Sequence, residues 1–437
     1  MKFLFTTLPS NDLGLLTRSL PIARELKEHG HKITFCNPAR SPSKLISEAG
    51  FDNLLPSHRL QAAFLRARPD LTEINLKAFS YYLRSIPYRM PSVTAEIRDI
   101  DHFGAMIGML NEGFVRAYHE AYVTLIQDFE TDAVVDFWNP FACLAARTQK
   151  KPLVTIIQAD IHPASQGFTW WQAPQPRITR PAEIANAILE ENDQEPIEKV
   201  GDLFAGDLTL VLGIPETDPL PESAVATYVG PILWQNESIK MPDWFANLSE
   251  EKPVVWVYVG NPRYLPFVTP MDSESTLEIC IQILAEEDVQ VILTSGHHKL
   301  PKKLLPLPDN FIYESFLPGL QMAHRSDLLI HHGGYGSCQT GLSSGTPAVI
   351  IPTYSERESN ARRVVATGAG EMILPKKGHG WKRIVSADEL RIKIRRVLSE
   401  PAYKESAYHI SQKMQKFGGA KEATRQIENF IQPDLKV

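Results

Sequence analysis

The sequence contains little cysteine and no long hydrophobic stretch. Only four of its 437 residues are cysteines, at positions 36, 143, 280 and 338. This wide spacing shows neither a metal motif nor a disulfide framework, so we expect a reducing, cytoplasmic environment. No apolar run is long enough to cross a bilayer, which predicts no transmembrane segment. The opening stretch, MKFLFTTLPS, predicts a first buried strand rather than a secretory signal.

The charge balance also excludes some classes of protein. The formal net charge is −6, with 22% charged and 43% hydrophobic residues. A chain without excess positive charge is not expected to bind nucleic acid or anionic membranes broadly. The sequence has no internal repeat and no low-complexity tract. Because 437 residues are too many for one hydrophobic core, two or three domains are expected.

The most informative stretch runs from Leu328 to Gly370. It predicts a strand at Leu328–Ile330, a glycine turn, a helix beginning near Ser337, a second strand at Ala348–Ile351 and a second helix from Glu356 to Thr367. A helix that follows a glycine turn exposes unpaired N–H groups to which phosphate can bind closely. The alternative is a glycine-rich turn that binds no ligand.

The same stretch resembles the donor site of nucleotide-sugar-dependent glycosyltransferases in the UDP-glycosyltransferase superfamily, which have the GT-B fold. It is most similar to the bacterial enzymes that glycosylate macrolides and other natural products. The matching positions share one register and are His332-Gly333-Gly334-Tyr335-Gly336-Ser337, Gly345-Thr346-Pro347, Glu356-Arg357, Asn360-Ala361 and Gly368-Ala369-Gly370.

The resemblance implies an α/β protein with two Rossmann-like domains, whose parallel sheets face a cleft. Residues 1–235 would form the acceptor domain and residues 240–410 the donor domain. Residues 411–437 would return to the first domain, as part of one long helix from about Lys404 to Ile431.

The resemblance further implies an inverting, metal-independent transfer of a sugar to a small-molecule acceptor. The donor would be a UDP- or dTDP-sugar acting as a co-substrate, with no other cofactor and no metal site; the oligomeric state stays open. His332 and Ser337 would hold the diphosphate with the turn amides, and Glu356 would bind sugar hydroxyls. The full predicted donor site is Gly14, Asn261, Phe316, His332, Gly333, Gly334, Gly336, Ser337, Glu356, Arg357 and Asn360.

The sequence departs from the family pattern at several positions, among them Phe316, which takes the place of a tryptophan that stacks on the nucleotide base. Thr340 replaces a glutamate that commonly binds the ribose. Arg357 replaces a glutamine; it could favour an acidic sugar, although pairing with Glu356 or Glu358 is the preferred interpretation. Leu15 occupies the position of the usual catalytic histidine, and leucine cannot accept a proton.

The missing base leaves several alternatives. Asp136 lies at the end of a predicted strand, where open α/β sheets bind ligands, and is the preferred base. It could instead be a buried structural acid. Asp12 and His162 are further candidates, and an acceptor that is itself acidic would need no base.

An apolar, aromatic or polyketide-like acceptor is predicted from the first half of the chain. Trp170 and Trp171 lie in a predicted loop. Aromatic and methionine-rich helices form either core or an adaptable apolar pocket. The Asp99-Ile100-Asp101 sequence is interpreted as solvated charge and not as a metal motif. The residues of this aromatic and methionine-rich region are Phe79, Tyr81, Tyr82, Tyr88, Met90, Phe103, Met106, Met109, Phe114, Tyr118 and Tyr122.

Two rival functions remain open at this point. A non-catalytic relative would keep the sugar-nucleotide site to bind a ligand or assist a partner, and the missing base favours this alternative. A GT-B sugar-nucleotide 2-epimerase is the second rival, although it should lack an aromatic acceptor region.

Overall fold

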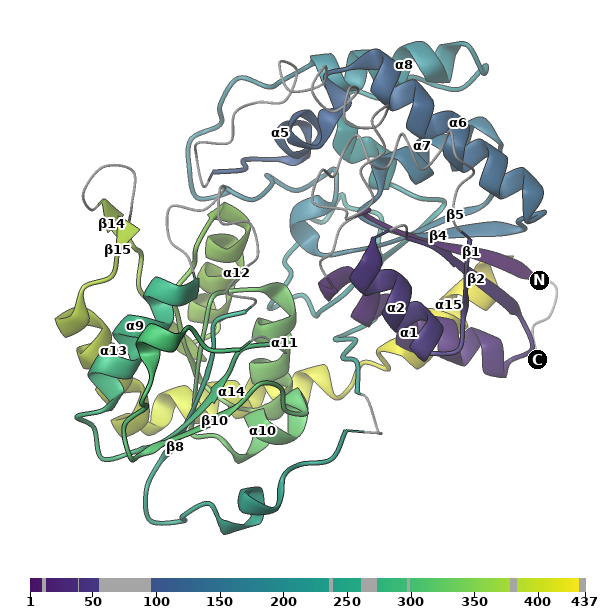
Figure 1. The fold of residues 1–437 in the computed structure, drawn as a ribbon. Helices are drawn as coiled ribbons and strands as arrows, with labels where there is room; N and C mark the ends of the chain where they lie inside the picture. Colours follow the sequence, from purple (N-terminus) through teal and green to yellow (C-terminus); the bar gives the residue numbers. More distant parts are fainter. Residues whose placement is uncertain are drawn as a thin grey trace. The chain divides into compact units, whose positions relative to one another are not determined.

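The computed structural model describes residues 1–9, 13–37, 39–54, 96–235, 239–260, 273–296, 299–377 and 383–431. The chain divides into two compact units (Figure 1). The first unit comprises residues 1–91, 98–234 and 417–437. The second comprises residues 92–97 and 235–416. Apart from residues 92–97, the chain passes into the second unit after Trp234 and returns to the first at Phe417.

The described residues of the first unit form a parallel sheet with the strand order β3-β2-β1-β4-β5-β6-β7. The order reverses between β1 and β4, which is where such sheets bind ligands. Every residue of β4 and β5 is buried, as expected for parallel strands covered on both faces. The strands are β1 Lys2–Thr7, β2 Lys32–Cys36, β3 Asp52–Asn53, β4 Ala133–Phe137, β5 Leu153–Ile157, β6 Leu208–Val211 and β7 Thr227–Tyr228.

The helices of the first unit include one that begins earlier than predicted. The segment from Ser10 to Leu16 reads as a loop in the sequence, but α1 begins at Gly14, and Leu15 and Leu16 are buried in the core. The described helices are α1 Gly14–Glu28, α2 Arg40–Glu48, α5 Ile100–Gly104, the π-helix η2 Ala105–Met109, α6 Glu112–Asp128, α7 Pro140–Thr148, α8 Arg180–Glu190 and α15 Ala420–Ile431, with 3-10 turns η3 Ala159–Ile161 and η4 Val200–Phe204.

The prediction of one long carboxyl-terminal helix is wrong, because two glycines divide it. Helix α14 ends at Met414 and α15 begins at Ala420, with Gly418 and Gly419 between them. Gly419 has a φ of +58°, which favours glycine, and its amide donates to the Val229 carbonyl at 2.7 Å. Helix α15 packs against α1 (Figure 1), so the last helix completes the first unit.

The second unit repeats the strand order of the first. Its described sheet is parallel, with the order β10-β9-β8-β11-β12-β13, and the order reverses between β8 and β11. Valine, leucine and isoleucine side chains from these strands form a continuous buried core. The strands are β8 Val254–Tyr258, β9 Gln290–Thr294, β10 Phe311–Glu314, β11 Leu328–His331, β12 Ala348–Ile350 and β13 Gly370–Met372, with a separate antiparallel pair, β14 Lys376–Lys377 and β15 Arg383–Ile384.

The helices of the second unit agree closely with the sequence pattern. Ser386, followed by Glu389 in the sequence pattern of a capping box, caps α13: its hydroxyl accepts the Glu389 amide at 3.3 Å. Helix α11 begins at Tyr335, two residues before the predicted start at Ser337. The described helices are α9 Ser273–Leu284, α10 Gly319–Arg325, α11 Tyr335–Ser344, α12 Ser355–Ala366, α13 Ala387–Ser399 and α14 Pro401–Met414, with 3-10 turns η5 Asp243–Asn247 and η6 Lys302–Leu304.

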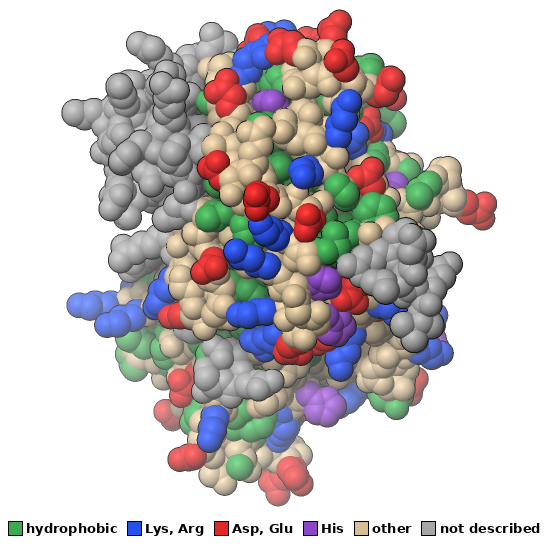
Figure 2. All heavy atoms as spheres, turned by 90° about the vertical axis from the view of Figure 1, so that its right-hand side faces the viewer, with side chains coloured by type: hydrophobic (Ala, Val, Ile, Leu, Met, Phe, Trp, Pro, Cys, Tyr) green, Lys and Arg blue, Asp and Glu red, His purple; other side chains and the backbone are tan. Residues whose placement is uncertain are grey.

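The surface mixes charges of both signs. On the face shown in Figure 2, acidic and basic side chains are interspersed. Among the described residues, the helices are all too short or too polar to cross a membrane.

Candidate functional site

The glycine turn connects β11 to α11, and its backbone is packed tightly against neighbouring groups. Gly333 has a φ of +83°, and a Cβ atom there would lie 2.6 Å from the Arg357 carbonyl oxygen. A Cβ atom on Gly334 would lie 2.5 Å from Nε2 of His332. Real Cβ atoms do not approach other atoms so closely. Gly333 therefore requires glycine, because the obstacle is backbone, whereas a side chain at Gly334 would have to displace the His332 ring or the turn.

The amino end of α11 is open. Gly334 is the N-cap residue and provides no side-chain hydrogen bond to the helix. The amides of Gly334 and Gly336 donate to no group in the described part of the chain, and a Cβ atom on Gly336 would meet nothing within 4 Å. The Ser337 amide differs, because it donates to the Gly334 carbonyl at 3.0 Å. Its hydroxyl remains available, so the turn offers two amides and one hydroxyl to an anion.

His332 lies beside this turn with a neutral ring. It is buried, and its Nδ1 atom has no hydrogen-bond partner among the described residues. Burial lowers the pKa of His332 well below its usual value, and the positive charges of Arg357 and of a protonated His331 lower this pKa further. A neutral imidazole can donate a hydrogen bond from one ring nitrogen. His332 can therefore donate to a ligand without carrying charge.

His331 is a member of the site that the sequence interpretation omitted. It is fully buried, and Nδ1 accepts the Gly333 amide at 3.1 Å. Burial lowers its pKa to about 3, so the ring is neutral at physiological pH. Because Nδ1 is an acceptor, the ring proton is assigned to Nε2. His331 thereby holds the backbone of the turn in place.

Helix α12 supplies the predicted sugar-binding residues. The Asn360 amide nitrogen donates to the Gly333 carbonyl at 3.0 Å and to Oε1 of Glu356 at 2.8 Å. Both hydrogens of this NH₂ group are thus used within the protein. Asn360 therefore orients the half-buried Glu356 carboxylate and the turn.

Arg357 does not form the ion pair that we expected. In the described structure it has no carboxylate partner: Nη1 donates to Oγ1 of Thr353 at 2.6 Å, and the guanidinium lies 4.6 Å from the centre of the Tyr354 ring. Glu358 instead pairs with Arg362 at 2.7 Å. The interpretation of Arg357 as a partner of Glu356 or Glu358 was therefore wrong.

The remaining donor-site predictions are placed differently. Phe316 lies between β10 and α10 and is half-buried, which is compatible with stacking on a base. Gly14 begins α1, in the first unit. Asn261 and the candidate base Asp12 lie outside the described residues. Thr340, at the position of the usual ribose-binding glutamate, donates its hydroxyl to the Gly336 carbonyl at 2.8 Å.

Asp136, the preferred base, is part of a closed hydrogen-bond network in the first unit. Its side chain is fully buried; one carboxylate oxygen accepts the Thr6 hydroxyl at 2.5 Å and the other the Asn139 amide at 2.9 Å. Burial raises the pKa of Asp136 to about 7, opposed by the hydrogen bonds from Thr6, Asn139 and Cys143. These contacts favour the structural alternative, because an acceptor would have to open the network to reach the carboxylate.

Trp138 follows Asp136, and the sequence interpretation gave it no role. Its φ of 64° is unusual for a large residue, and such strain often marks functional sites. The half-buried indole packs edge-on against Phe103 and at a tilt against Phe168, with 5.9 Å between the ring centroids in each pair. Trp138 thus forms part of an aromatic cluster at the carboxyl edge of the sheet, where ligands bind.

The aromatic and methionine-rich region divides into core and surface. Phe103 and Met106 are half-buried, whereas Met109, Phe114, Tyr118 and Tyr122 belong to the core. Met106 lies in the π-helix η2, a type of turn that is frequent at functional sites. Trp170 is 36% exposed and contacts Trp171. The other predicted members of this region, Phe79, Tyr81, Tyr82, Tyr88 and Met90, lie outside the described residues.

Two further acidic and basic candidates have structural roles. Asp101 is buried, pairs with Arg177 at 3.1 Å and accepts the Val200 amide at 2.7 Å, so its interpretation as solvated charge was wrong. His162 is buried and accepts the Ala164 amide at 3.1 Å; burial lowers its pKa. Within the described ranges, no group of three His, Cys, Asp or Glu side chains could hold a metal ion.

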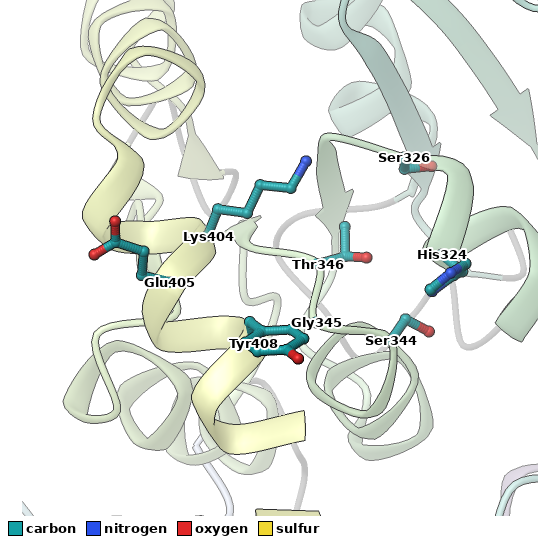
Figure 3. A pocket seen from close by; sticks show the side chains of 8 residues that line it. All are labelled: His324, Ser326, Ser344, Gly345, Thr346, Lys404, Glu405 and Tyr408. Atoms are coloured by element: carbon teal, nitrogen blue, oxygen red, sulfur yellow. The ribbon is translucent and has the colours of Figure 1, made fainter. Parts of the chain in front are cut away.

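A separate hollow of about 340 Å³ lies elsewhere on the second unit (Figure 3). Ser326 and Thr346, which precede β11 and β12, line it together with Lys404 and Tyr408 of α14. It is therefore at the amino edge of the sheet, whereas the glycine turn follows the carboxyl end of β11. The hollow is distinct from the candidate donor site.

Comparison with known proteins identifies the type of fold and the relatives. Residues 278–429 match the family described as erythromycin biosynthesis protein CIII-like, C-terminal domain. The uncharacterized UDP-glucosyltransferase YojK of Bacillus subtilis (strain 168) is 28% identical over 243 residues, which are 55% of this chain and 56% of YojK. The 4'-demethylrebeccamycin synthase of Lentzea aerocolonigenes is 29% identical over 238 residues, which are 54% of this chain and 52% of the synthase. The matches thus span about half the length of these relatives.

A solved structure extends the comparison to the whole chain. The spinosyn rhamnosyltransferase SpnG, complexed with spinosyn aglycone, matches with a TM-score of 0.66 and 16% identity. The match covers 98% of this chain and 100% of that one. These comparisons confirm the predicted resemblance to natural-product glycosyltransferases, and the chain has the GT-B fold.

Proposed function

We propose that this protein transfers a sugar from a nucleotide-diphosphate sugar to an apolar small-molecule acceptor. The observation that carries the proposal is the open amino end of α11, with the available amides of Gly334 and Gly336 beside the neutral, buried His332. Such an arrangement favours the binding of a phosphate group. The similarity of this region to named glycosyltransferases supports the same conclusion.

The proposed reaction is an inverting displacement. The acceptor oxygen attacks the anomeric carbon and forms the new bond from the face opposite the diphosphate. The bond between that carbon and the diphosphate oxygen breaks, and the diphosphate leaves with the electron pair. The amides of Gly334 and Gly336, the Ser337 hydroxyl and a His332 N–H would stabilise the charge on the departing group. The proposal includes no metal ion and no cofactor besides the donor.

The donor would be positioned by α12 and by the loop before α10. Glu356, oriented by Asn360 at 2.8 Å, would accept hydrogen bonds from sugar hydroxyls. Phe316 would stack on the nucleotide base. A UDP- or dTDP-sugar is proposed, and the name of the relative YojK supports UDP.

The acceptor would bind in the first unit, against Trp138, Phe103 and Met106. Their half-buried apolar surfaces support an apolar acceptor, as does the aglycone named for the similar structure of SpnG. Because both Asp136 oxygens accept hydrogen bonds within the protein, we propose that this residue positions Trp138. The proton would then pass to Asp12, or the acceptor would be acidic enough to need no base.

A product-release assay with the full chain tests this function. UDP- and dTDP-sugars are incubated with a library containing phenols, carboxylic acids, neutral alcohols and polyketide aglycones. We expect release of nucleoside diphosphate that depends on the acceptor, and an acceptor whose mass increases by one sugar. Asp12→Asn should reduce turnover of neutral alcohols more than that of phenols.

Other outcomes of the same assay would identify the rival functions. Release of diphosphate without acceptor, accompanied by a sugar altered at carbon 2, would indicate an epimerase. Tight binding of UDP or dTDP without turnover of any acceptor in the library would favour a binding or helper protein.

A further inference from the structure

Arg357 carries a positive charge beside the glycine turn that no described carboxylate neutralises. The acidic neighbours on α12 have other contacts: Glu358 pairs with Arg362 at 2.7 Å, and Glu356 accepts the Asn360 amide at 2.8 Å. Arg357 itself contacts Thr353 and the face of Tyr354, and both contacts leave its charge in place. Its Nε atom is buried and has no hydrogen-bond partner within the described residues. An unpaired, partly buried cation is costly, which points to an external counter-ion.

The position of Arg357 places this charge next to the proposed diphosphate site. A Cβ atom on Gly333 would lie 3.1 Å from Cβ of Arg357, so the two backbones are in direct contact. The guanidinium is also close enough to His332 to lower the pKa of that histidine. Because His332 is neutral, the positive charge beside the turn comes from Arg357, among the residues that the structure describes in the second unit.

The surroundings of Arg357 orient it for binding. Nη1 is held by the Thr353 hydroxyl at 2.6 Å, and the Tyr354 ring supports the guanidinium plane at 4.6 Å. These contacts restrict the side chain, while its Nε atom has no hydrogen-bond partner among the described residues. A guanidinium edge matches the geometry of two phosphate oxygens.

We propose that Arg357 binds the diphosphate of the donor and supplies the positive charge that stabilises it as it leaves. This inference rests on the proposed function, because it assumes that a nucleotide-diphosphate sugar is the donor. The amides and His332 would provide hydrogen bonds, whereas Arg357 would provide charge. An anionic sugar, such as a hexuronic acid, has a carboxylate with matching chemistry, so the experiment must separate these two sources of negative charge.

The test compares ligands by calorimetry with the full chain. The variants are Arg357→Gln, Arg357→Lys and the control Arg362→Gln, which removes the same charge from the same helix. The ligands are UDP and dTDP, UMP and dTMP, and the pair UDP-glucose and UDP-glucuronic acid. A melting temperature and a circular dichroism spectrum equal to those of the wild type would show that the fold of each variant is intact.

We expect Arg357→Gln to weaken UDP or dTDP binding about 10- to 100-fold, as for loss of a hydrogen bond between charged groups. The affinity for UMP and dTMP should fall less than that for UDP and dTDP. The affinity of Arg357→Lys for UDP should lie between those of the wild type and Arg357→Gln, because lysine keeps the charge but lacks the planar guanidinium. The ratio of UDP-glucuronic acid to UDP-glucose affinity should stay unchanged. Added KCl should weaken UDP binding more in the wild type than in Arg357→Gln.

Three outcomes would contradict the inference. Equal UDP and dTDP affinities in the wild type and Arg357→Gln would overturn it while leaving the proposed function intact. A loss confined to UDP-glucuronic acid would assign Arg357 to a sugar carboxylate and overturn the diphosphate assignment. If the wild type bound neither UDP nor dTDP, the proposed function would fail, and this inference with it.

Discussion

The turn after β4 and the turn after β11 occupy the same position in their two sheets, yet they differ in chemistry. Each follows the strand beside the point where the strand order reverses. After β4, Asn139 caps α7 by accepting the Ala142 amide at 3.3 Å. After β11, Gly334 leaves the amino end of α11 without a side-chain cap.

The difference extends to the polar side chains around each turn. In the first unit, the Asp136 oxygens accept hydrogen bonds from the Thr6 hydroxyl and the Asn139 backbone N–H. The side-chain NH₂ of Asn139 donates to the Tyr122 hydroxyl and to the Thr7 carbonyl. In the second unit, Nε2 of His331 and Nδ1 of His332 have no hydrogen-bond partner among the described residues. A helix end capped by its own chain has a structural role, whereas an uncapped one with unpaired neighbours is suited to an external ligand.

The largest effect should come from filling the open turn. In Gly334→Ala, the new Cβ atom would lie 2.5 Å from Nε2 of His332, so the His332 ring or the turn must shift. We expect UDP and dTDP binding to be lost in calorimetry. The double variant His332→Ala/Gly334→Ala removes the clash, so it should melt at a higher temperature than Gly334→Ala alone. Undiminished UDP binding by Gly334→Ala would show that this turn is not the donor site.

Removing the His332 ring should have the next largest effect. His332→Ala is expected to weaken UDP or dTDP binding about 10-fold, consistent with loss of one hydrogen bond to an anion. The fold should stay intact, since Nδ1 of the ring has no hydrogen-bond partner among the described residues. His324→Ala, on the exposed end of α10, is the matched control. Unchanged affinity in His332→Ala would remove this residue from the site.

Asp136→Asn should alter the closed network of the first unit. The amide places an NH₂ group opposite one of the two donors, Thr6 or Asn139, at a cost of about 1–3 kcal/mol in unfolding free energy. Burial raises the pKa of Asp136 in the folded protein to about 7, from an ordinary value of 3.8. Between these two pH values the folded protein therefore retains a proton that the unfolded chain has lost. This group therefore makes stability fall as pH rises from about 4 to 7.

The variant Asp136→Asn should lack this pH-dependent contribution to the free energy of unfolding. Melting temperatures between pH 5 and 8 should show the largest difference between wild type and Asp136→Asn at the acidic end. Asp132→Asn, at an exposed carboxylate, is the control. A strong loss of turnover on neutral alcohols at unchanged stability would instead restore Asp136 as the base.

The smallest expected effect concerns the strained Trp138. With φ at 64°, glycine suits this position better than alanine, so Trp138→Gly should be more stable than Trp138→Ala by about 1 kcal/mol. Both should raise the KM for the acceptor and leave the affinity for UDP unchanged. Equal acceptor KM values in wild type and variants would exclude an acceptor contact at Trp138.

The second unit was more predictable from sequence than the first. The glycine pattern of Gly333, Gly334 and Gly336 reports directly on backbone geometry, and the structure shows the close approaches that require it. The hydrogen bond from Gly333 to His331 could not be predicted, because it depends on the rotation of one buried ring. The absence of a described carboxylate partner for Arg357 was also unpredictable. The sequence places Glu358 next to Arg357, but it does not show that Glu358 pairs with Arg362 instead.

In the first unit, the sequence identified strands but not the partners of polar residues. Asp136 was placed correctly at the end of β4. Its role depends on Thr6, which is 130 residues away, and on the strained backbone of Trp138. Such long-range contacts leave no pattern in a single sequence.

The return of the chain at Phe417 restricts how chimeras of this protein can be built. Gly419 hydrogen-bonds to Val229, and a Cβ atom on Gly230 would lie 2.4 Å from Cβ of Phe417, so the outgoing and returning segments pack together. Helix α15 also packs against α1, and its Glu428 contacts both His29 and His31, which follow α1. A graft that exchanges acceptor units between relatives must therefore transfer two separate pieces of gene, one encoding residues up to Trp234 and another beginning at Phe417. A single crossover near residue 235 would join each α1 to a foreign α15.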